Sequence, residues 1–274
     1  MPDQAPPADA PFAALVLAGR RGPRDPLALA SGVSHKALIR IAGSPMLLRV
    51  LQTLEAAGSV AGCRVCIDDP AALDAVPALR PLLAERRITL EPSAETPSAS
   101  VLGCLDRLAP RQPLLVTTAD HPLLTAPMVD YFCREALAHN ADVVVGVVTR
   151  ETVRRGFPET RRTFIPLRGE GVTGANLFVL RTPHARRAVE FWRRAERLRK
   201  SPWRLVSLFG LGSLARFALR RLDLDAALER ASQVMGARVE AVRLPFAECA
   251  IDVDRPDDLA LASRVLAPGA PLEP

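Results

Sequence analysis

The sequence lacks the segments that direct a protein into or across a membrane. No apolar stretch reaches the roughly 20 residues that span a bilayer. The N-terminus has neither the basic region nor the apolar core of a secretory signal. We therefore expect a cytoplasmic protein that does not cross a membrane.

Cysteine is scarce, and its spacing argues against a metal site. Five cysteines occur among 274 residues, and two of them, Cys63 and Cys66, form a C-x-x-C pair. No second Cys/His pair is present to complete a zinc site. The pair lies in a strand-like run, where positions three apart point to opposite faces. We expect ordinary core thiols.

Lysine is almost absent. Lys36 and Lys200 are the two lysines, and arginine supplies the other fixed positive charges. Because arginine serves nearly everywhere else, a lysine at position 36 suggests that a compact point charge is needed there.

The net charge of +6 comes from one segment. Residues 181–221 carry twelve Lys/Arg against two Glu, so the rest of the chain is net negative. We expect a local basic face and no nucleic-acid binding. Within this segment, residues 203–222 pair large apolar side chains with arginines. Such a stripe packs on its own domain, packs on a second copy in a homodimer, or makes a peripheral membrane contact; the sequence leaves these three open.

The length fits one domain with an insert. Residues 1–11 and 267–274, which are rich in proline, are predicted to be disordered tails. The domain then covers residues 12–266, with a basic helical insert at about 182–222.

Strands and helices alternate in the first half of this domain. Predicted strands lie at 13–17, 64–67, 114–118 and 143–148, and predicted helices at 45–57, 71–85, 98–108 and 126–138. Further along, we predict loops or short edge strands over 150–170, strands at 177–180, 241–244 and 249–253, and helices at 225–235 and 256–265. The alternation indicates an α/β layer with a mostly parallel sheet, whose ligands bind at the carboxyl ends of strands.

A loop rich in small and basic residues follows the first of these strands. It contains Gly19, Gly22 and several arginines, and Lys36 comes soon after it. Small residues let backbone N–H groups approach a phosphate, and cations offset its charge. The composition of this loop therefore predicts a polyphosphate site, although a plain turn is the simpler interpretation.

Four segments, in order, resemble the nucleotidyltransferase superfamily, and within it the molybdenum-cofactor guanylyl- and cytidylyltransferases (MobA-like NTP transferase domains). They are residues 17–24 followed by Lys36, residues 98–105, residues 116–124 and residues 251–259. Arg20 departs from the pattern, because it stands where the family has its second glycine. The resemblance implies a single three-layer, Rossmann-like α/β domain of the glycosyltransferase-A-like kind, with a mostly parallel mixed sheet.

The resemblance also implies roles for individual residues. The implied nucleotide-binding residues are Leu17, Ala18, Gly19, Arg20, Arg21, Gly22, Lys36, Ser100 and Asp120. Lys36 would bridge α-phosphate oxygens, Arg24 would hold the departing pyrophosphate, and Asp120 would act through a metal ion. The turn that contains Gly174 and Asn176 resembles the part of the family that meets the acceptor, and Arg162 lies upstream to bind the acceptor's phosphate.

Three aspartates are candidate ligands for Mg²⁺. Asp120 follows a predicted strand, and Asp252 and Asp254 lie in the closing motif of the resemblance. Mg²⁺ usually takes one or two carboxylates together with substrate phosphates. Each aspartate is also a plausible helix cap, and the sequence does not decide between Asp252 and Asp254 as the second ligand.

Together these features predict an Mg²⁺-dependent nucleotidyltransferase. It would transfer an NMP unit from a nucleoside triphosphate to a phosphorylated small-molecule acceptor and release pyrophosphate. Two alternatives stay open: a nucleotide-sugar-dependent glycosyltransferase that uses Asp252-Val-Asp254 as a D-x-D motif, and a non-catalytic nucleotide-binding protein of the same fold. The sequence reveals neither the base nor the acceptor.

Overall fold

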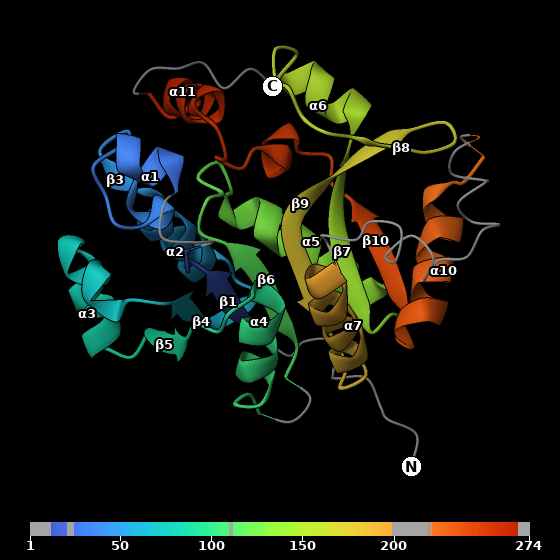
Figure 1. The fold of residues 1–274 in the computed structure, drawn as a ribbon, viewed down its shortest axis with the longest axis horizontal. Helices are drawn as coiled ribbons and strands as arrows, with labels where there is room; N and C mark the ends of the chain where they lie inside the picture. Colours follow the sequence, from blue (N-terminus) through green and yellow to red (C-terminus); the bar gives the residue numbers. More distant parts are fainter. Residues whose placement is uncertain (1–11, 21–24, 110–111, 199–218, 220, 268–274) are drawn as a thin grey trace.

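An eight-stranded sheet forms the centre of the protein (Figure 1). The structure is a computed structural model, and it describes residues 12–20, 25–109, 112–198, 219 and 221–267. The strands are β1 (Phe12–Leu17), β4 (Val60–Ile67), β5 (Ile88–Pro92), β6 (Leu114–Thr118), β7 (Val143–Thr149), β8 (Ile165–Pro166), β9 (Gly171–Leu180) and β10 (Val239–Arg243). Their order is β10-β7-β9-β6-β1-β4-β5, and β8 pairs with β9. β9 is antiparallel to its neighbours, and the other pairs are parallel. The predicted α/β fold with a mostly parallel sheet is confirmed.

Helices cover both faces of this sheet. Buried side chains of α2 (Met46–Ala56), α3 (Leu79–Ala84) and α5 (Ala126–Ala138) pack on one face. Those of α4 (Pro97–Leu105) and α7 (Ala185–Leu198), joined by α10 (Leu224–Met235), pack on the other. The three-layer arrangement follows from this division.

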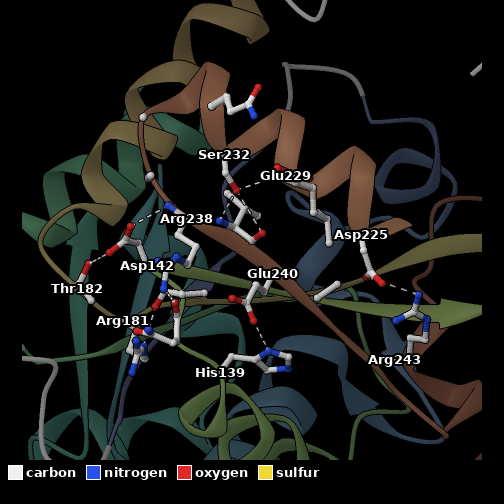
Figure 2. Close-up of a pocket in the computed structure, with 18 residues that line it drawn as sticks. His139, Asp142, Arg181, Thr182, Asp225, Glu229, Ser232, Arg238, Glu240 and Arg243 are labelled. Atoms are coloured by element: carbon white, nitrogen blue, oxygen red, sulfur yellow. Dashed lines mark hydrogen bonds and ion pairs between the residues drawn. The ribbon is translucent and has the colours of Figure 1, made fainter. Parts of the chain in front are cut away.

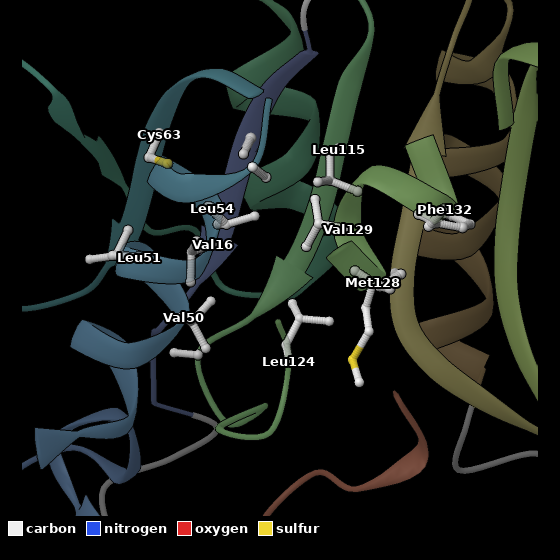
Figure 3. Packing of buried hydrophobic residues seen from close by; sticks show 14 of the residues in the cluster. Val16, Val50, Leu51, Leu54, Cys63, Leu115, Leu124, Met128, Val129 and Phe132 are labelled. Atoms are coloured by element: carbon white, nitrogen blue, oxygen red, sulfur yellow. The ribbon is translucent and has the colours of Figure 1, made fainter. Parts of the chain in front are cut away.

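Strand β1 shows why the central strands are apolar throughout. Ala14 and Val16 belong to the core on one face, whereas Ala13 and Leu15 belong to the core on the other. A central parallel strand is covered on both faces, so it needs a continuous apolar run rather than an alternating one. Figure 3 shows the packing of Val16 among residues of α2 and α5.

The cysteines are buried and unpaired. All five are free, and Cys63 and Cys66 lie in the cores on opposite faces of the sheet. Burial raises the pKa of Cys63, Cys104 and Cys133 to about 12, so these thiols stay protonated at neutral pH. The prediction of ordinary core thiols is confirmed.

Several predicted boundaries differ from the structure. The predicted helix at 71–85 is a 3-10 turn, η2 (Pro70–Ala75), followed by α3, because Pro77 and Pro81 lack the N–H groups of a continuous helix. The predicted loop at 150–170 begins with a helix, α6 (Arg150–Gly156), capped by Thr149. The predicted strand at 249–253 is replaced by a 3-10 turn, η3 (Ala247–Ala250), and irregular backbone.

Short elements frame the carboxyl edge of the sheet. They are α1 (Pro26–Ala30), η1 (Lys36–Leu38), β2 (Arg40–Ile41), β3 (Ser44–Pro45) and the closing helix α11 (Pro256–Val265). α11 has the bounds that the sequence predicts.

The predicted basic insert at 182–222 is only partly described. Its first part forms α7, and most of residues 203–222, for which the sequence left three interpretations open, lies outside the described residues, as do the tails 1–11 and 268–274. In the described part of the chain, no helix has the length and apolar character needed to cross a membrane.

Candidate active site

The carboxyl ends of β1 and β6 meet the C-terminal part of the chain at the carboxyl edge of the sheet, which is the side where its parallel strands end. The N–H of Ala119 donates to the carbonyl of Leu17 at 3.0 Å, and the N–H of Val253 donates to the carbonyl of Asp120 at 2.9 Å. The second bond attaches the segment between η3 and α11 to the end of β6. Residues from both ends of the sequence therefore share this edge.

Lys36 lies between two aspartates at this edge. Its Nζ is 2.5 Å from Oδ2 of Asp120 and 2.6 Å from Oδ1 of Asp254. The side chains of Lys36 and Asp120 are 16% and 7% exposed, whereas that of Asp254 is 41% exposed. The structure thus brings together the predicted lysine and two of the three predicted aspartates.

The charges of Lys36 and Asp120 stabilise each other. Burial by itself would raise the pKa of Asp120, but the Lys36 ammonium outweighs burial and holds that pKa below its ordinary value. Burial would lower the pKa of Lys36, yet Asp120 and then Asp254 hold it above its ordinary value. Lys36 and Asp120 are therefore both charged at neutral pH.

One oxygen of Asp120 has no hydrogen-bond partner. Oδ1 is buried and accepts no hydrogen bond of ordinary geometry from the described residues, although the nearby Thr118 hydroxyl helps to lower the pKa of Asp120. A buried carboxylate oxygen left in this way calls for an explanation, such as an absent ion or water. No cluster of three or more His, Cys, Asp or Glu side chains that could hold a metal is found in the described ranges, so the protein offers two carboxylates rather than a complete metal cage.

Asp252 has different partners from Asp254. Arg162 donates to its Oδ1 and, at 2.6 Å, to its carbonyl oxygen, and Asn176 Nδ2 donates to its Oδ2 at 3.1 Å. Arg162 also pairs with Asp258 on α11 at 3.2 Å. Two residues predicted to bind the acceptor therefore hold Asp252, and both of its carboxylate oxygens have partners.

The backbone of β9 explains the position of Asn176. β9 is antiparallel to β6, so its middle, not its end, reaches the carboxyl edge. Asn176 has a φ of 50°, a left-handed conformation that asparagine tolerates better than most residues. Gly174, the other predicted acceptor residue on β9, is exposed and lies opposite Val147 of β7.

A second polar cluster lies at the ends of β1 and β4. Asp68 directly follows β4 and accepts from the backbone N–H of Arg20 at 3.0 Å and from its Nε at 2.7 Å. Nε2 of buried His35 lies 3.1 Å from the same carboxylate, and Ser34 Oγ is 2.9 Å from His35 Nδ1. Arg20, which departs from the family pattern, is thus fixed on Asp68.

The loop after β5 lies against the loop after β1. A Cβ at Gly19 would lie 2.9 Å from Ser93 Oγ, so any larger residue there would force the Ser93 hydroxyl to move. Ser100 of α4 accepts a hydrogen bond from the N–H of Ala94 at 2.9 Å. Ser100, which the resemblance implies is a nucleotide-binding residue, therefore fixes the loop that lies against Gly19.

His121 is buried beside Asp120. Its Nε2 donates to the carbonyl of Cys249 at 3.0 Å, which places the proton on that nitrogen because a carbonyl can only accept. Burial lowers its pKa, so it is neutral. This contact holds η3 against the end of β6.

The remaining predicted site residues fall into two groups. Leu17 and Ala18 contribute backbone at the end of β1. Arg21, Gly22 and Arg24 lie outside the described residues. Sequence reasoning missed Asp68, although it directly follows a parallel strand, the same signal that identified Asp120.

A cavity of about 1010 Å³ lies elsewhere, beside α10 and the edge strand β10 (Figure 2). Several of its polar side chains already have partners within the protein: His139 is 2.5 Å from Glu240, and Asp142 accepts from the Thr182 hydroxyl and from the backbone N–H of Arg238. None of the predicted site residues lines it. The edge that carries Lys36 is therefore the candidate active site.

Comparisons with known proteins agree with this fold. Residues 14–235 match the MobA-like NTP transferase domain. A hypothetical transferase from Thermus thermophilus is 32% identical, covers 91% of this chain and 99% of its own, and superposes with a TM-score of 0.76. No curated protein matches the sequence.

Two more distant structures share the fold. The 4-diphosphocytidyl-2C-methyl-D-erythritol synthase of Anaerococcus prevotii is 13% identical over 93% of this chain and 95% of its own, with a TM-score of 0.57. A CMP:2-keto-3-deoxy-manno-octonic acid synthetase in complex with CTP is 14% identical over 85% of this chain and 89% of its own, with a TM-score of 0.51. With its sequence match extending over residues 14–235, the chain belongs to the family of MobA-like NTP transferase domains.

Proposed function

We propose that this protein is an Mg²⁺-dependent nucleotidyltransferase that transfers an NMP unit from a nucleoside triphosphate to a phosphorylated small-molecule acceptor. The observation that carries the proposal is the position of Lys36 Nζ, 2.5 Å from Asp120 and 2.6 Å from Asp254 at the carboxyl edge of the sheet. A half-buried cation and two carboxylates at this edge suit a polyanionic substrate with its metal ion.

The donor set fits Mg²⁺ with Asp120 and Asp254 as its protein ligands. Asp120 has a buried oxygen without a partner, and Asp254 is partly exposed beside it. Asp252 is less suited, because Arg162 and Asn176 occupy both of its oxygens. When bound, Mg²⁺ supplies positive charge that neutralises phosphate oxygens.

The reaction needs one bond to form and one to break. An oxygen of the acceptor phosphate attacks the α-phosphorus, and the bond from the α-phosphorus to the oxygen that bridges to the β-phosphate breaks, which releases pyrophosphate. Such transfers depend mainly on positioning and electrostatic stabilisation. Lys36 would place its ammonium on the α-phosphate oxygens as negative charge develops there. Asp252, Arg162 and Asn176 would form the part of the site that binds the acceptor.

The other two predicted functions have less support. A D-x-D motif for a nucleotide sugar would use Asp252 and Asp254 together, whereas each oxygen of Asp252 already accepts from Arg162 or Asn176. A purely nucleotide-binding role would not need the predicted acceptor residues Arg162 and Asn176 beside the same edge. The five free thiols suit a reducing compartment such as the cytoplasm.

The test is a pyrophosphate-release assay with each of the four nucleoside triphosphates, Mg²⁺ and a panel of phosphorylated acceptors. We expect turnover with one triphosphate, and at least about a hundredfold loss in Asp120→Asn and Lys36→Ala. Asp106→Asn is the matched control, because Asp106 pairs with Arg186 on the surface and should not alter turnover. Full activity of both site variants, or release of a nucleoside diphosphate from nucleotide sugars, would contradict the proposal.

A further inference from the structure

Arg20 is a cation near the candidate site, because it shares Asp68 with His35, the residue that precedes Lys36. It directly follows Gly19 at the end of β1, and its guanidinium Nε lies 2.7 Å from Oδ2 of Asp68. No other side-chain partner of Arg20 is found among the described residues. The guanidinium is thus held by a single carboxylate.

This ion pair is partly open to solvent. The side chain of Arg20 is 37% exposed and that of Asp68 is 31% exposed. Ion pairs in contact with water contribute little, because water screens the attraction and the side chains lose freedom. A triphosphate offers the same guanidinium more negative charge and bidentate oxygen pairs, which arginine binds strongly.

Asp68 does not depend on the guanidinium alone. Its Oδ1 accepts from the backbone N–H of Arg20 and lies 3.1 Å from Nε2 of buried His35. If the guanidinium left, this carboxylate would keep two partners and would not be left as an unpaired buried charge. Arg20 can therefore change partners at low cost, while the backbone of the loop keeps its attachment to Asp68.

We propose that Arg20 exchanges Asp68 for the β- and γ-phosphates when the nucleotide binds, and that Asp68 sets the affinity for polyphosphate by competing for this guanidinium. The inference rests on the proposed function, since it assigns a triphosphate to this edge. It makes Asp68 a positioning residue that never touches the substrate. It also gives Arg20, at a position where the family has glycine, a direct role in binding the leaving group.

The test is a double-mutant cycle with inorganic tripolyphosphate and pyrophosphate as ligands, measured by calorimetry. We expect Arg20→Ala to weaken tripolyphosphate binding about tenfold, and Asp68→Asn to tighten it about fivefold by releasing the guanidinium. In the Arg20→Ala background, Asp68→Asn should have a clearly smaller effect. Asp106→Asn removes the same charge from a remote surface pair and should change binding less than twofold, about the size of distant screened charges.

A second measurement keeps the inference testable if Asp68→Asn fails to fold. The NMR resonance of the Arg20 Nε–H, assigned by its loss in Arg20→Ala, should move when tripolyphosphate saturates the wild-type protein. A resonance that stays in place at saturation would overturn the exchange. So would an effect of Asp68→Asn that is equal or larger in the Arg20→Ala background, because it would show only the general repulsion between Asp68 and the ligand.

These outcomes are separate from those of the proposed function. Binding of tripolyphosphate with the expected cycle, but no pyrophosphate release from any triphosphate, would support the exchange and contradict catalysis. Turnover without any coupling between Arg20 and Asp68 would overturn the exchange and leave the proposed function standing.

Discussion

At the scale of single residues, the charge of Lys36 is expected to affect both the stability of the fold and the proposed reaction. A buried carboxylate is costly without a cation beside it, and Asp120, at 7% side-chain exposure, has Lys36 as its ion-pair partner. The same ammonium reaches the more exposed Asp254. Removing it should therefore disturb folding as well as activity.

Lys36→Met is expected to lower the free energy of unfolding by about 3 kcal/mol, because it leaves Asp120 buried without its cation. Urea unfolding at neutral pH measures this. Arg155→Met is the control: its partner Glu151 is exposed, and the loss should be no more than about 0.5 kcal/mol. Combining Lys36→Met with Asp120→Asn should recover part of the loss; additive losses would contradict the pairing.

The two aspartates of the closing motif should differ in their effects on the reaction. Asp254→Asn is expected to reduce kcat by at least about a hundredfold and to raise the Mg²⁺ concentration needed for half-maximal rate. Asp252→Asn, whose amide oxygen can still accept from Arg162, should mainly raise KM for the acceptor. Steady-state kinetics with varied Mg²⁺ and acceptor separate the two, and a reversed pattern would favour Asp252 as the metal ligand.

The sequence predicts which residues belong to the candidate site better than it predicts which side chains contact one another there. Lys36, Asp120 and Asp254 were all predicted at one site, but the direct contact of the lysine with both aspartates depends on how η1 and the segment before α11 fold onto β6. The positions of Arg162 and Asn176 on Asp252 also required the structure. Side-chain pairing over such separations leaves no local pattern in the sequence.

At the scale of elements, the contact between α6 and η3 positions the closing motif. Gly156, the last residue of α6, lies so close to η3 that a Cβ there would be 2.6 Å from the Cβ of Ala247. η3 in turn leads into Asp252 and Asp254. The sequence predicted neither element, because a seven-residue helix and a single 3-10 turn are too short to show a clear periodicity.

Gly156→Ala is expected to destabilise the protein by about 2 kcal/mol, because backbone or η3 must shift to admit the methyl group. Thermal unfolding and turnover should both decline. Gly62→Ala serves as the control, since a Cβ on Gly62 meets open space. Adding Ala247→Gly to Gly156→Ala should restore most of the loss, and failure to do so would mean that this contact does not position the motif.

At the scale of the whole molecule, the apolar layers on both faces of the sheet bury every cysteine. The alternation of strands and helices predicted this architecture because a repeated pattern persists even where single boundaries are wrong. The antiparallel insertion of β9 between β6 and β7 was not predicted, since strand order depends on contacts distant in sequence.

Native protein should react with iodoacetamide at least about a hundredfold more slowly than protein unfolded in urea, because only an accessible thiolate reacts. The pKa of about 12 at Cys249, Cys133, Cys104 and Cys63 keeps these thiols protonated. Mass spectrometry of the alkylated chain should show five labels after unfolding and few before. Rapid labelling of Cys63 or Cys66 in the native state would contradict their place in the core.

The bond from Val253 to the end of β6 has a consequence for how the protein acquires its site. Lys36 and Asp254 are 218 positions apart, so nearly the whole chain must be synthesised before they can meet. Strands β1, β4, β5 and β6 come from the first half of the chain and lie side by side, so they close shorter loops and are expected to form earlier. Docking of the segment before α11 is then a late folding step, and the appearance of the complete charge cluster reports that the last part of the molecule has reached its native position.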